Sequence, residues 1–352
     1  MVKYSEEDTE GETVFTATKL DSDIRGKLMY TLKEERKIFA YQGFRFGKAE
    51  RFSPPEDLGN YWSEHLGDEA FNATHIGLKC PQGSGGDEDC LFLNVYTPFK
   101  PGTDDAKNRT VMFFIHGGAF VAGDATSYLP TKLLNHDVIL VTTHYRLGAF
   151  GFYTRNSRKA PGNLAFYDMI SALRWVQKYI SDFDLFRAVI AESGAALDHW
   201  AFDEDYTYAT NYYEHEVGCD IYETEDEILD CMRKVPYLDI LEAGQKMIHE
   251  DRRNGLIGFR GCSPTIQTFN DTGLDFANIL YQHPRDFMIN REFKDVPFLT
   301  GANREEGSLI FGIMLFDYLI PNNLLFNTSY LREGMLRDLL LSVGSKLNFL
   351  KQ

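Results

Sequence analysis

The sequence has little positive charge and no long apolar run. Its 36 lysines and arginines are outnumbered by 52 aspartates and glutamates, which gives a formal net charge of -16. Such a chain lacks the basic surface that phosphate backbones and anionic lipid headgroups require, so we exclude nucleic acid as a partner. The longest apolar stretch, residues 308–316, is about half of the roughly 20 residues that cross a bilayer. We therefore predict no membrane span.

Two further absences concern secretion and metals. The N-terminus, MVKYSEEDTEGE, is acidic and polar, so it has neither the basic start nor the apolar centre of a signal peptide. The sequence contains no Cys-x-x-Cys pair and no histidine cluster. We expect neither a metal site nor a cofactor.

Cysteine is scarce, but its spacing is informative. The five cysteines are Cys80, Cys90, Cys219, Cys231 and Cys262. Two close pairs and one remaining residue are expected of two local disulfides and a free thiol in a secreted protein. Five unconnected thiols in a cytosolic chain fit the composition equally well. Four Asn-x-Ser/Thr sequons are candidate glycosylation sites, and they begin at Asn72, Asn108, Asn270 and Asn327.

The first half of the chain is predicted to form mainly β-strands. Short β-rich runs at residues 13–20, 24–32 and 37–41 are separated by polar turns and predict antiparallel strands, and residues 91–96 continue in this style. The hydrophobic pattern then changes from short runs to continuous apolar ones. Residues 111–115 (VMFFI) and 138–143 (VILVTT) are such runs, which are typical of parallel strands buried on both faces.

Helices and strands then alternate. Residues 164–180 have apolar residues at helical spacing, which predicts a crossover helix. A short β run follows at 188–191, a helical and acidic segment at 203–250, and one more buried strand at 296–300. This order predicts the α/β class, with a mixed sheet flanked by helices.

Seven segments in order along the chain carry a family resemblance. They are RFSPP (51–55), EDCLFLNVYTP (88–98), FIHGGAF (114–120), YRLGAFGF (145–152), APGNLAFYDMISALRWVQKYI (160–180), AESGAALDHWAF (191–202) and GANREEGSLIF (301–311). On these segments the chain resembles the type-B carboxylesterase and cholinesterase family of α/β-hydrolases. The resemblance implies one truncated α/β-hydrolase domain over residues 1–352.

The resemblance also implies site residues. In HGGAF the backbone turns tightly after a strand, and N–H groups aimed into a pocket can stabilise the oxyanion of an ester's tetrahedral intermediate. The implied donors are the amides of Gly118 and Ala119, with Ala119 standing where the family usually has a third glycine. Glu306 matches the acid of the family's catalytic triad.

Four structural pairs follow from the same resemblance. It implies disulfides Cys80–Cys90 and Cys219–Cys231, with Cys262 unpaired, and the ion pairs Arg51–Glu88 and Arg146–Asp168. The loop closed by Cys80 is shorter than in cholinesterases, which argues against a choline ester as substrate.

Compared with the family's sequence pattern, the chain lacks a segment after residue 184. In the family, the helix that ends near residue 180 leads to a central strand, a Gly-x-Ser-x-Gly nucleophile elbow and a further helix. Here residues 183–184 join 185–186 directly, so roughly 30 residues or more are absent. Ser193 lies in AESGA, where alanine replaces both glycines, so we expect a structural role for it. No histidine follows Glu306 in the sequence.

We therefore expect a carboxylesterase-like chain that is catalytically inactive, either as a truncated product or because internal segments have been lost from its sequence. Loss of the nucleophile or base costs on the order of a millionfold in turnover. Two alternatives stay open: a non-catalytic binding or adhesion protein with a protein partner, and a weak esterase of small carboxylic esters with Ser193 as nucleophile. By resemblance the protein is extracellular, although its N-terminus is not that of a signal peptide.

Overall fold

The computed structural model describes residues 12–17, 22–56, 58, 70–180, 186–198, 201–256, 261, 263–335 and 337. The chain divides into two compact units. The first consists of Met1–Gly118, Ala122–Arg146 and Leu164–Leu185. The second consists of Ala119–Val121, Leu147–Asn163 and Phe186–Gln352. The junction at residues 183–186 falls largely outside the described residues.

The first unit is built on a mixed sheet. Its strands are β1 (Glu12–Ala17), β2 (Ser22–Tyr30), β3 (Lys37–Arg45), β4 (Phe71–Asn72), β5 (Phe92–Thr97), β6 (Thr110–Ile115) and β7 (Val138–Thr143). The order is β1-β2-β3-β5-β7-β6, with β4 alongside β2. Pairing is antiparallel from β1 to β7 along this order, and β6 is parallel to β7. The predicted mixed sheet with an antiparallel start is confirmed.

A bulge interrupts β3 where it pairs with β5. The register shifts between Tyr41 and Phe44. Gly43 lies in this bulge at a φ of +77°, and a Cβ placed there would come within 2.5 Å of the His75 carbonyl oxygen. A side chain would therefore be strained and would collide with backbone, so the bulge depends on glycine.

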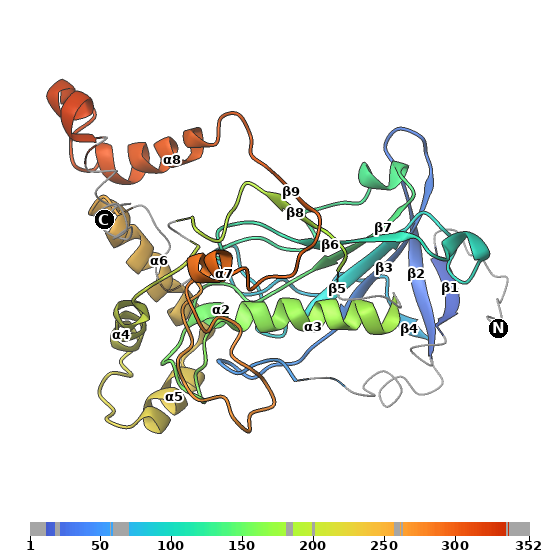
Figure 1. The fold of residues 1–352 in the computed structure, drawn as a ribbon, viewed down its shortest axis with the longest axis horizontal. Coiled ribbons are helices and arrows are strands. Elements are labelled where there is room, and N and C mark those ends of the chain that lie inside the picture. Colours follow the sequence, from blue (N-terminus) through green and yellow to red (C-terminus); the bar gives the residue numbers. More distant parts are fainter. Residues whose placement is uncertain are drawn as a thin grey trace. The chain divides into compact units, whose positions relative to one another are not determined.

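The sheet has an apolar core on each face. Helix α3 (Leu164–Tyr179) runs along one face (Figure 1), where Trp175 and Val176 join the buried cluster that contains Phe44 and Leu93. The helix predicted over residues 164–180 is confirmed. On the other face, Leu134 joins a second buried cluster. Leu134 belongs to the 3-10 turn η2 (Leu133–Asn135), and a second such turn is η1 (Asp104–Ala106).

The second unit is mainly helical. Its helices are α2 (Gly148–Phe152), α4 (Tyr206–Glu216), α5 (Glu225–Lys234), α6 (Tyr237–Arg253), α7 (Pro284–Asn290) and α8 (Gly307–Met314), with π-helical turns η3 (Leu315–Leu319) and η4 (Tyr330–Gly334). A capping box of Thr224 and Glu227 begins α5. The buried carboxylate of Glu214, on α4, accepts hydrogen bonds from the Tyr153 hydroxyl, at 2.7 Å, and from Arg155.

Two strands of this unit form a separate parallel pair, β8 (Val189–Glu192) and β9 (Phe298–Gly301). The prediction that residues 296–300 form a buried strand is wrong about burial, because all four residues of β9 are exposed. The physical reason is that, among the described strands, β9 has β8 as its sole neighbour. In the first unit, β6 at the sheet edge is also partly exposed, whereas β7 has a neighbour on each side and is largely buried.

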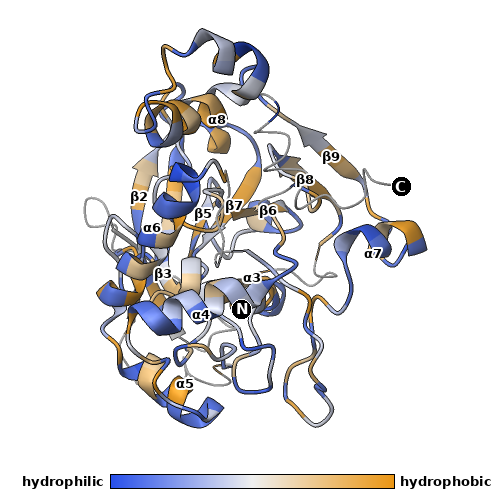
Figure 2. Cartoon of the chain, turned by 90° about the vertical axis from the view of Figure 1, so that its left-hand side faces the viewer, coloured by the Kyte–Doolittle hydropathy of each residue, from blue (hydrophilic) through white to orange (hydrophobic). Residues whose placement is uncertain are grey.

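Helix α8 is apolar and mostly exposed. Figure 2 colours it orange, the hydrophobic end of the scale, and Leu309 and Phe311 are both exposed. None of the helices that the structure describes is long and apolar enough to cross a bilayer.

Candidate active site

The turn that follows β6 holds the two predicted oxyanion donors. Gly118 has a φ of +118°, and a Cβ on it would lie 1.9 Å from the Ala122 carbonyl oxygen, so this position requires glycine. Ala119 adopts a φ of +52°, a conformation that costs an alanine about 1 kcal/mol. Within the part of the chain that the structure describes, neither N–H is hydrogen-bonded. Among the described residues, neither donor therefore has a backbone acceptor.

Two buried aromatic rings support the base of this turn. The imidazole of His116 stacks on Tyr145 with ring centroids 4.3 Å apart, and the Tyr145 hydroxyl donates to the His116 carbonyl oxygen at 2.8 Å. Burial lowers the pKa of His116 and raises the pKa of Tyr145. Both side chains are thus neutral at pH 7. Two separate sequence segments, 114–120 and 145–152, contain these residues, and nothing in either segment predicted that the rings stack.

Ser193 lies directly after β8. Its backbone N–H donates to the Gly301 carbonyl oxygen at 2.8 Å, which continues the β8–β9 ladder by one residue. Its φ of +55° is unusual for a residue other than glycine. The chain therefore turns sharply at the end of a strand with the Ser193 side chain exposed.

Glu306 lies in the turn after β9 and faces this serine. Its Oε1 accepts a hydrogen bond from the Ser193 hydroxyl and another from the backbone N–H of Asn303, at 2.8 Å. The Ser193 hydroxyl, followed by the Asn303 amide, lowers the pKa of Glu306 below its usual value. The carboxylate is exposed and ionised at neutral pH.

Among the described residues, the pair of Ser193 and Glu306 has no hydrogen-bonded histidine, the relay that serine esterases use. A triad places a histidine between the serine and the acid, where it takes up the serine's proton. In the described part of the second unit, the groups that donate to Glu306 are a hydroxyl and an amide. A carboxylate with a lowered pKa is a weak general base near pH 7, because a base works best when its pKa is close to the working pH.

The contact between Ser193 and Glu306 was not predicted from the sequence. The two residues are 113 positions apart. A signal was nevertheless present, because each follows a β run, and the carboxyl ends of neighbouring parallel strands lie at the same edge of a sheet. The sequence does not reveal that β8 and β9 are neighbours.

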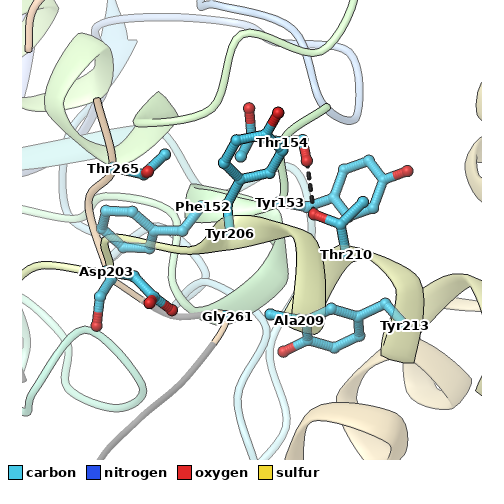
Figure 3. A pocket seen from close by; sticks show the side chains of 11 residues that line it. Phe152, Tyr153, Thr154, Asp203, Tyr206, Ala209, Thr210, Tyr213, Gly261 and Thr265 are labelled. Carbon is cyan, nitrogen blue, oxygen red and sulfur yellow. Dashed lines mark hydrogen bonds between the residues drawn. The ribbon is translucent and has the colours of Figure 1, made fainter. Parts of the chain in front are cut away.

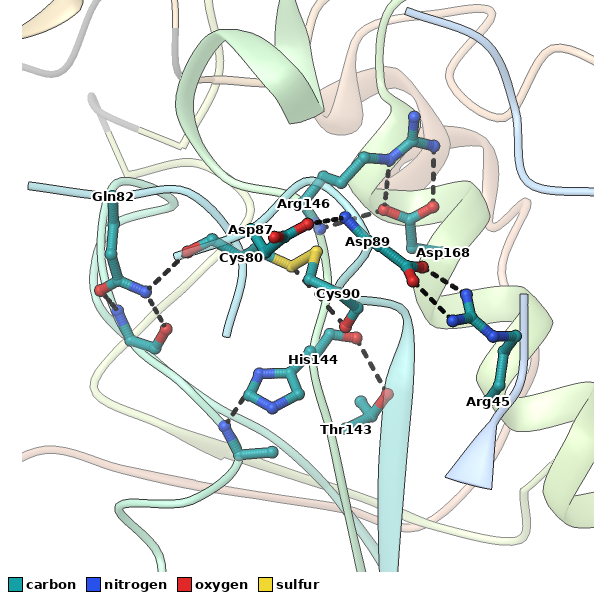
Figure 4. Close-up of a disulfide and its surroundings, with 12 residues drawn as sticks. Arg45, Cys80, Gln82, Asp87, Asp89, Cys90, Thr143, His144, Arg146 and Asp168 are labelled. Atoms are coloured by element: carbon teal, nitrogen blue, oxygen red, sulfur yellow. Dashed lines mark hydrogen bonds and ion pairs between the residues drawn. A yellow bond between two sulfur atoms is a disulfide. The ribbon is translucent and has the colours of Figure 1, made fainter. Parts of the chain in front are cut away.

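The first predicted disulfide lies in a network of polar contacts (Figure 4). Cys80 and Cys90 are bonded, with their Cα atoms 5.0 Å apart. The side-chain amide of Gln82 donates to the carbonyl oxygens of Cys80, at 3.2 Å, and of Gly123, at 2.8 Å. The disulfide loop is thereby held to the segment that follows the oxyanion turn.

Both predicted ion pairs are present in the first unit. Arg146 and Asp168 form a bidentate pair with distances of 2.9 and 2.8 Å, and the side chains are 6% and 0% exposed. The pair of Arg51 with Glu88 is also bidentate, but it is partly exposed. Both pairs join segments that are far apart in the sequence of the first unit.

The remaining predicted residues are three cysteines and the sequon asparagines. Cys219 and Cys231 form the second disulfide, which ties the end of α4 to α5. Cys262 lies outside the described residues. The four sequon asparagines, Asn72, Asn108, Asn270 and Asn327, are all exposed.

A small cavity in the described part of the second unit could be mistaken for a substrate site (Figure 3). Its walls include Phe152, Tyr153, Asp203, Tyr206 and Tyr213, and its volume is about 10 Å³. That volume holds about one water molecule. An ester does not fit. Among the described residues, no three histidine, cysteine or acidic side chains gather in a way that could hold a metal ion.

Comparison with known proteins gives a consistent result. The sequence model of the carboxylesterase family matches residues 11–184 and 183–332, two stretches that meet at the junction described above. Esterase FE4 of Myzus persicae is 32% identical over 83% of this chain and 56% of its own length. Juvenile hormone esterase of Tribolium castaneum is 30% identical over 81% of this chain and 53% of its own. The chain thus spans about half the length of these relatives.

A solved structure supports the same architecture. The crystal structure of juvenile hormone esterase from Manduca sexta, with OTFP covalently attached, superposes with a TM-score of 0.70 at 21% identity. The match covers 96% of this chain and 69% of that one. The α/β-hydrolase fold is therefore shared.

Proposed function

The chain belongs to the carboxylesterase family, and on that premise we propose that, as it stands, it retains the acid and the oxyanion turn of an ester hydrolase but does not hydrolyse esters. The observation that carries this proposal is the absence of the family's nucleophile motif from the sequence. No serine among the 352 residues has the Gly-x-Ser-x-Gly spacing. The donors at Gly118 and Ala119 then have no tetrahedral intermediate to stabilise. Loss of the nucleophile raises the barrier by about 8 kcal/mol, or roughly a millionfold in rate.

One specific observation favours a second candidate, a weak esterase of small carboxylic esters that uses Ser193. This serine lies at a sharp turn after a parallel strand, precedes a glycine, and bonds to a carboxylate, which are features of an activated nucleophile. One feature opposes it. The lowered pKa of Glu306 makes the carboxylate a poor general base near pH 7.

The two candidates differ in covalent labelling. The purified chain is incubated with p-nitrophenyl acetate and, separately, with a fluorophosphonate probe, beside the variants Ser193→Ala and Ser308→Ala. Ser308 is a matched control, because it is an exposed serine nearby whose hydroxyl donates to a backbone carbonyl at 2.6 Å. We expect neither turnover nor labelling in any of the three. Labelling that Ser193→Ala abolishes and Ser308→Ala does not would establish the weak esterase, and labelling of another residue would also overturn inactivity.

We further propose that the protein works outside the cell. Two disulfides in one chain are typical of an oxidising compartment. Of five cysteines, the four in disulfides leave one thiol. Protein isolated from its natural source under alkylating conditions should therefore react at one cysteine, and at all five only after reduction. Five reactive thiols before reduction would contradict this location.

A further inference from the structure

We propose that Asn72, Asn270 and Asn327 carry N-linked oligosaccharides attached through Nδ2. The inference rests on the extracellular location proposed above and is independent of ester chemistry. Each residue begins a sequon and is exposed. A sequon is a common short motif, so the assignment depends on how each side chain is held.

Asn72 is the last residue of β4. The backbone next to it is hydrogen-bonded, and its own side chain is exposed to solvent. The next residue, Ala73, is fully buried, and its N–H donates to the Arg25 carbonyl oxygen at 2.7 Å. Because side chains alternate along a strand, Asn72 points to solvent. Its Oδ1 accepts from the Thr74 backbone N–H at 3.2 Å and from the Thr74 hydroxyl at 2.7 Å.

Asn270 repeats this arrangement in a loop of the second unit. Its Oδ1 accepts from the backbone N–H of Thr272, the third residue of the sequon, at 2.9 Å. The loop around it is held by Asn278, whose side chain donates to the Phe269 carbonyl oxygen at 2.9 Å and whose N–H donates to Asp271 at 2.8 Å. The Oδ1 atom of Asn270 is thus held by a backbone N–H of the same loop.

Asn327 uses the same atom at the start of a helical turn. Its Oδ1 accepts from the Tyr330 N–H at 3.0 Å, directly before η4. The preceding Phe326 is 90% exposed, and Asn327 is itself exposed. The described residues therefore leave room for a bulky substituent here. The fourth sequon asparagine, Asn108, has no such side-chain bond among the described residues and is not part of the proposal.

In each of the three asparagines, the two polar atoms of the side-chain amide differ in their hydrogen bonding. Oδ1 is occupied, whereas Nδ2 of these three asparagines makes no hydrogen bond to any described residue. In glycosylation, Nδ2 forms a C–N bond to the first sugar of a glycosyl diphosphate donor. The sugar's C–O bond breaks, the diphosphate leaves with the bonding electrons, and Nδ2 releases one proton. The amide carbonyl is unchanged, so all the bonds to Oδ1 survive.

The test uses the full chain, expressed in insect cells behind a supplied secretion leader. Peptide N-glycosidase in heavy-oxygen water converts each glycosylated asparagine to a labelled aspartate, which peptide mass spectrometry locates. We expect the label at all three asparagines. Thr74→Ala, Thr272→Ala and Ser329→Ala should each abolish it at one site, whereas Thr74→Ser and Thr272→Ser keep the sequon and should retain it.

The supplied leader separates this inference from the proposed location. A chain that contains both disulfides has reached the oxidising lumen, where the sugar donor is present. Unmodified peptides from such a chain would overturn the inference at each asparagine concerned, while the natural location and the absence of ester hydrolysis keep their own tests. Label that persists in the alanine variants would likewise contradict attachment at these sequons.

Discussion

Arg146 and Asp168 show how strongly a residue's contribution depends on its surroundings. Both side chains are nearly inaccessible, and Asp168 accepts three hydrogen bonds from Arg146, one from its backbone and two from its guanidinium. Arg146 also donates to the Ser53 carbonyl oxygen at 2.8 Å. The pair therefore joins α3 to two loops of the first unit.

We expect Asp168→Ala to lower the free energy of unfolding by about 3 to 5 kcal/mol, because the change leaves a buried guanidinium without its counter-charge. Asp89→Ala is the matched control. Asp89 forms a bidentate pair with Arg45 but is itself 56% exposed. Its loss should cost about 0 to 1 kcal/mol. Urea denaturation measures both, and equal losses would contradict the role of burial.

His144 makes stability depend on pH. Burial, with a smaller effect of nearby His116, lowers its pKa to about 4 from a usual 6.5. As pH falls below 6.5, the unfolded chain binds a proton that the folded chain does not bind until about pH 4. Stability is therefore complete at pH 7 and is lost between pH 6.5 and 4, by about 3 kcal/mol in total from this residue.

Urea denaturation at a series of pH values checks this prediction. His144→Gln should flatten the decline, whereas His75→Gln, at an exposed histidine, should leave it intact. If His144→Gln does not fold, imidazole resonances of the unaltered protein report the titration directly. A midpoint near 6.5 for His144 would contradict the argument.

At the scale of elements, hydrophobic pattern predicted the strands and α3 well. Runs such as VMFFI and VILVTT became β6 and β7, and they are parallel as expected. Burial was predicted less well. An apolar run shows that the side chains of a strand are suited to burial. Whether they are buried depends on how many strands lie beside that strand.

Strands β8 and β9 should accordingly be less protected than β5 and β7. They form a two-stranded pair, and Phe298 and Leu299 on β9 are exposed. Amide hydrogen exchange should be fast in β8 and β9 and slow in β5 and β7, because local opening costs little where few apolar contacts are lost. Equal protection in the two sheets would show that β8 and β9 have further neighbours in solution.

At the scale of the whole molecule, the net charge predicts that the protein does not bind nucleic acid. With a formal net charge of -16, the protein should pass through a heparin column at physiological salt and bind an anion exchanger at pH 7. A duplex DNA fragment should show no mobility shift under the same conditions. Retention on heparin would reveal a basic patch that the net charge conceals.

The sequence by itself determined the family, the α/β class and the absence of a nucleophile elbow, because these depend on residue types in a fixed order along the chain. The two disulfides were implied by the family resemblance, and the structure contains both. Only the tertiary structure decided that Ser193 donates to Glu306, that β9 is exposed, and that His116 stacks on Tyr145. The physical reason is that a hydrogen bond across 113 residues requires two strand ends to be neighbours. Strand order and register set that neighbourhood, and local pattern does not encode them.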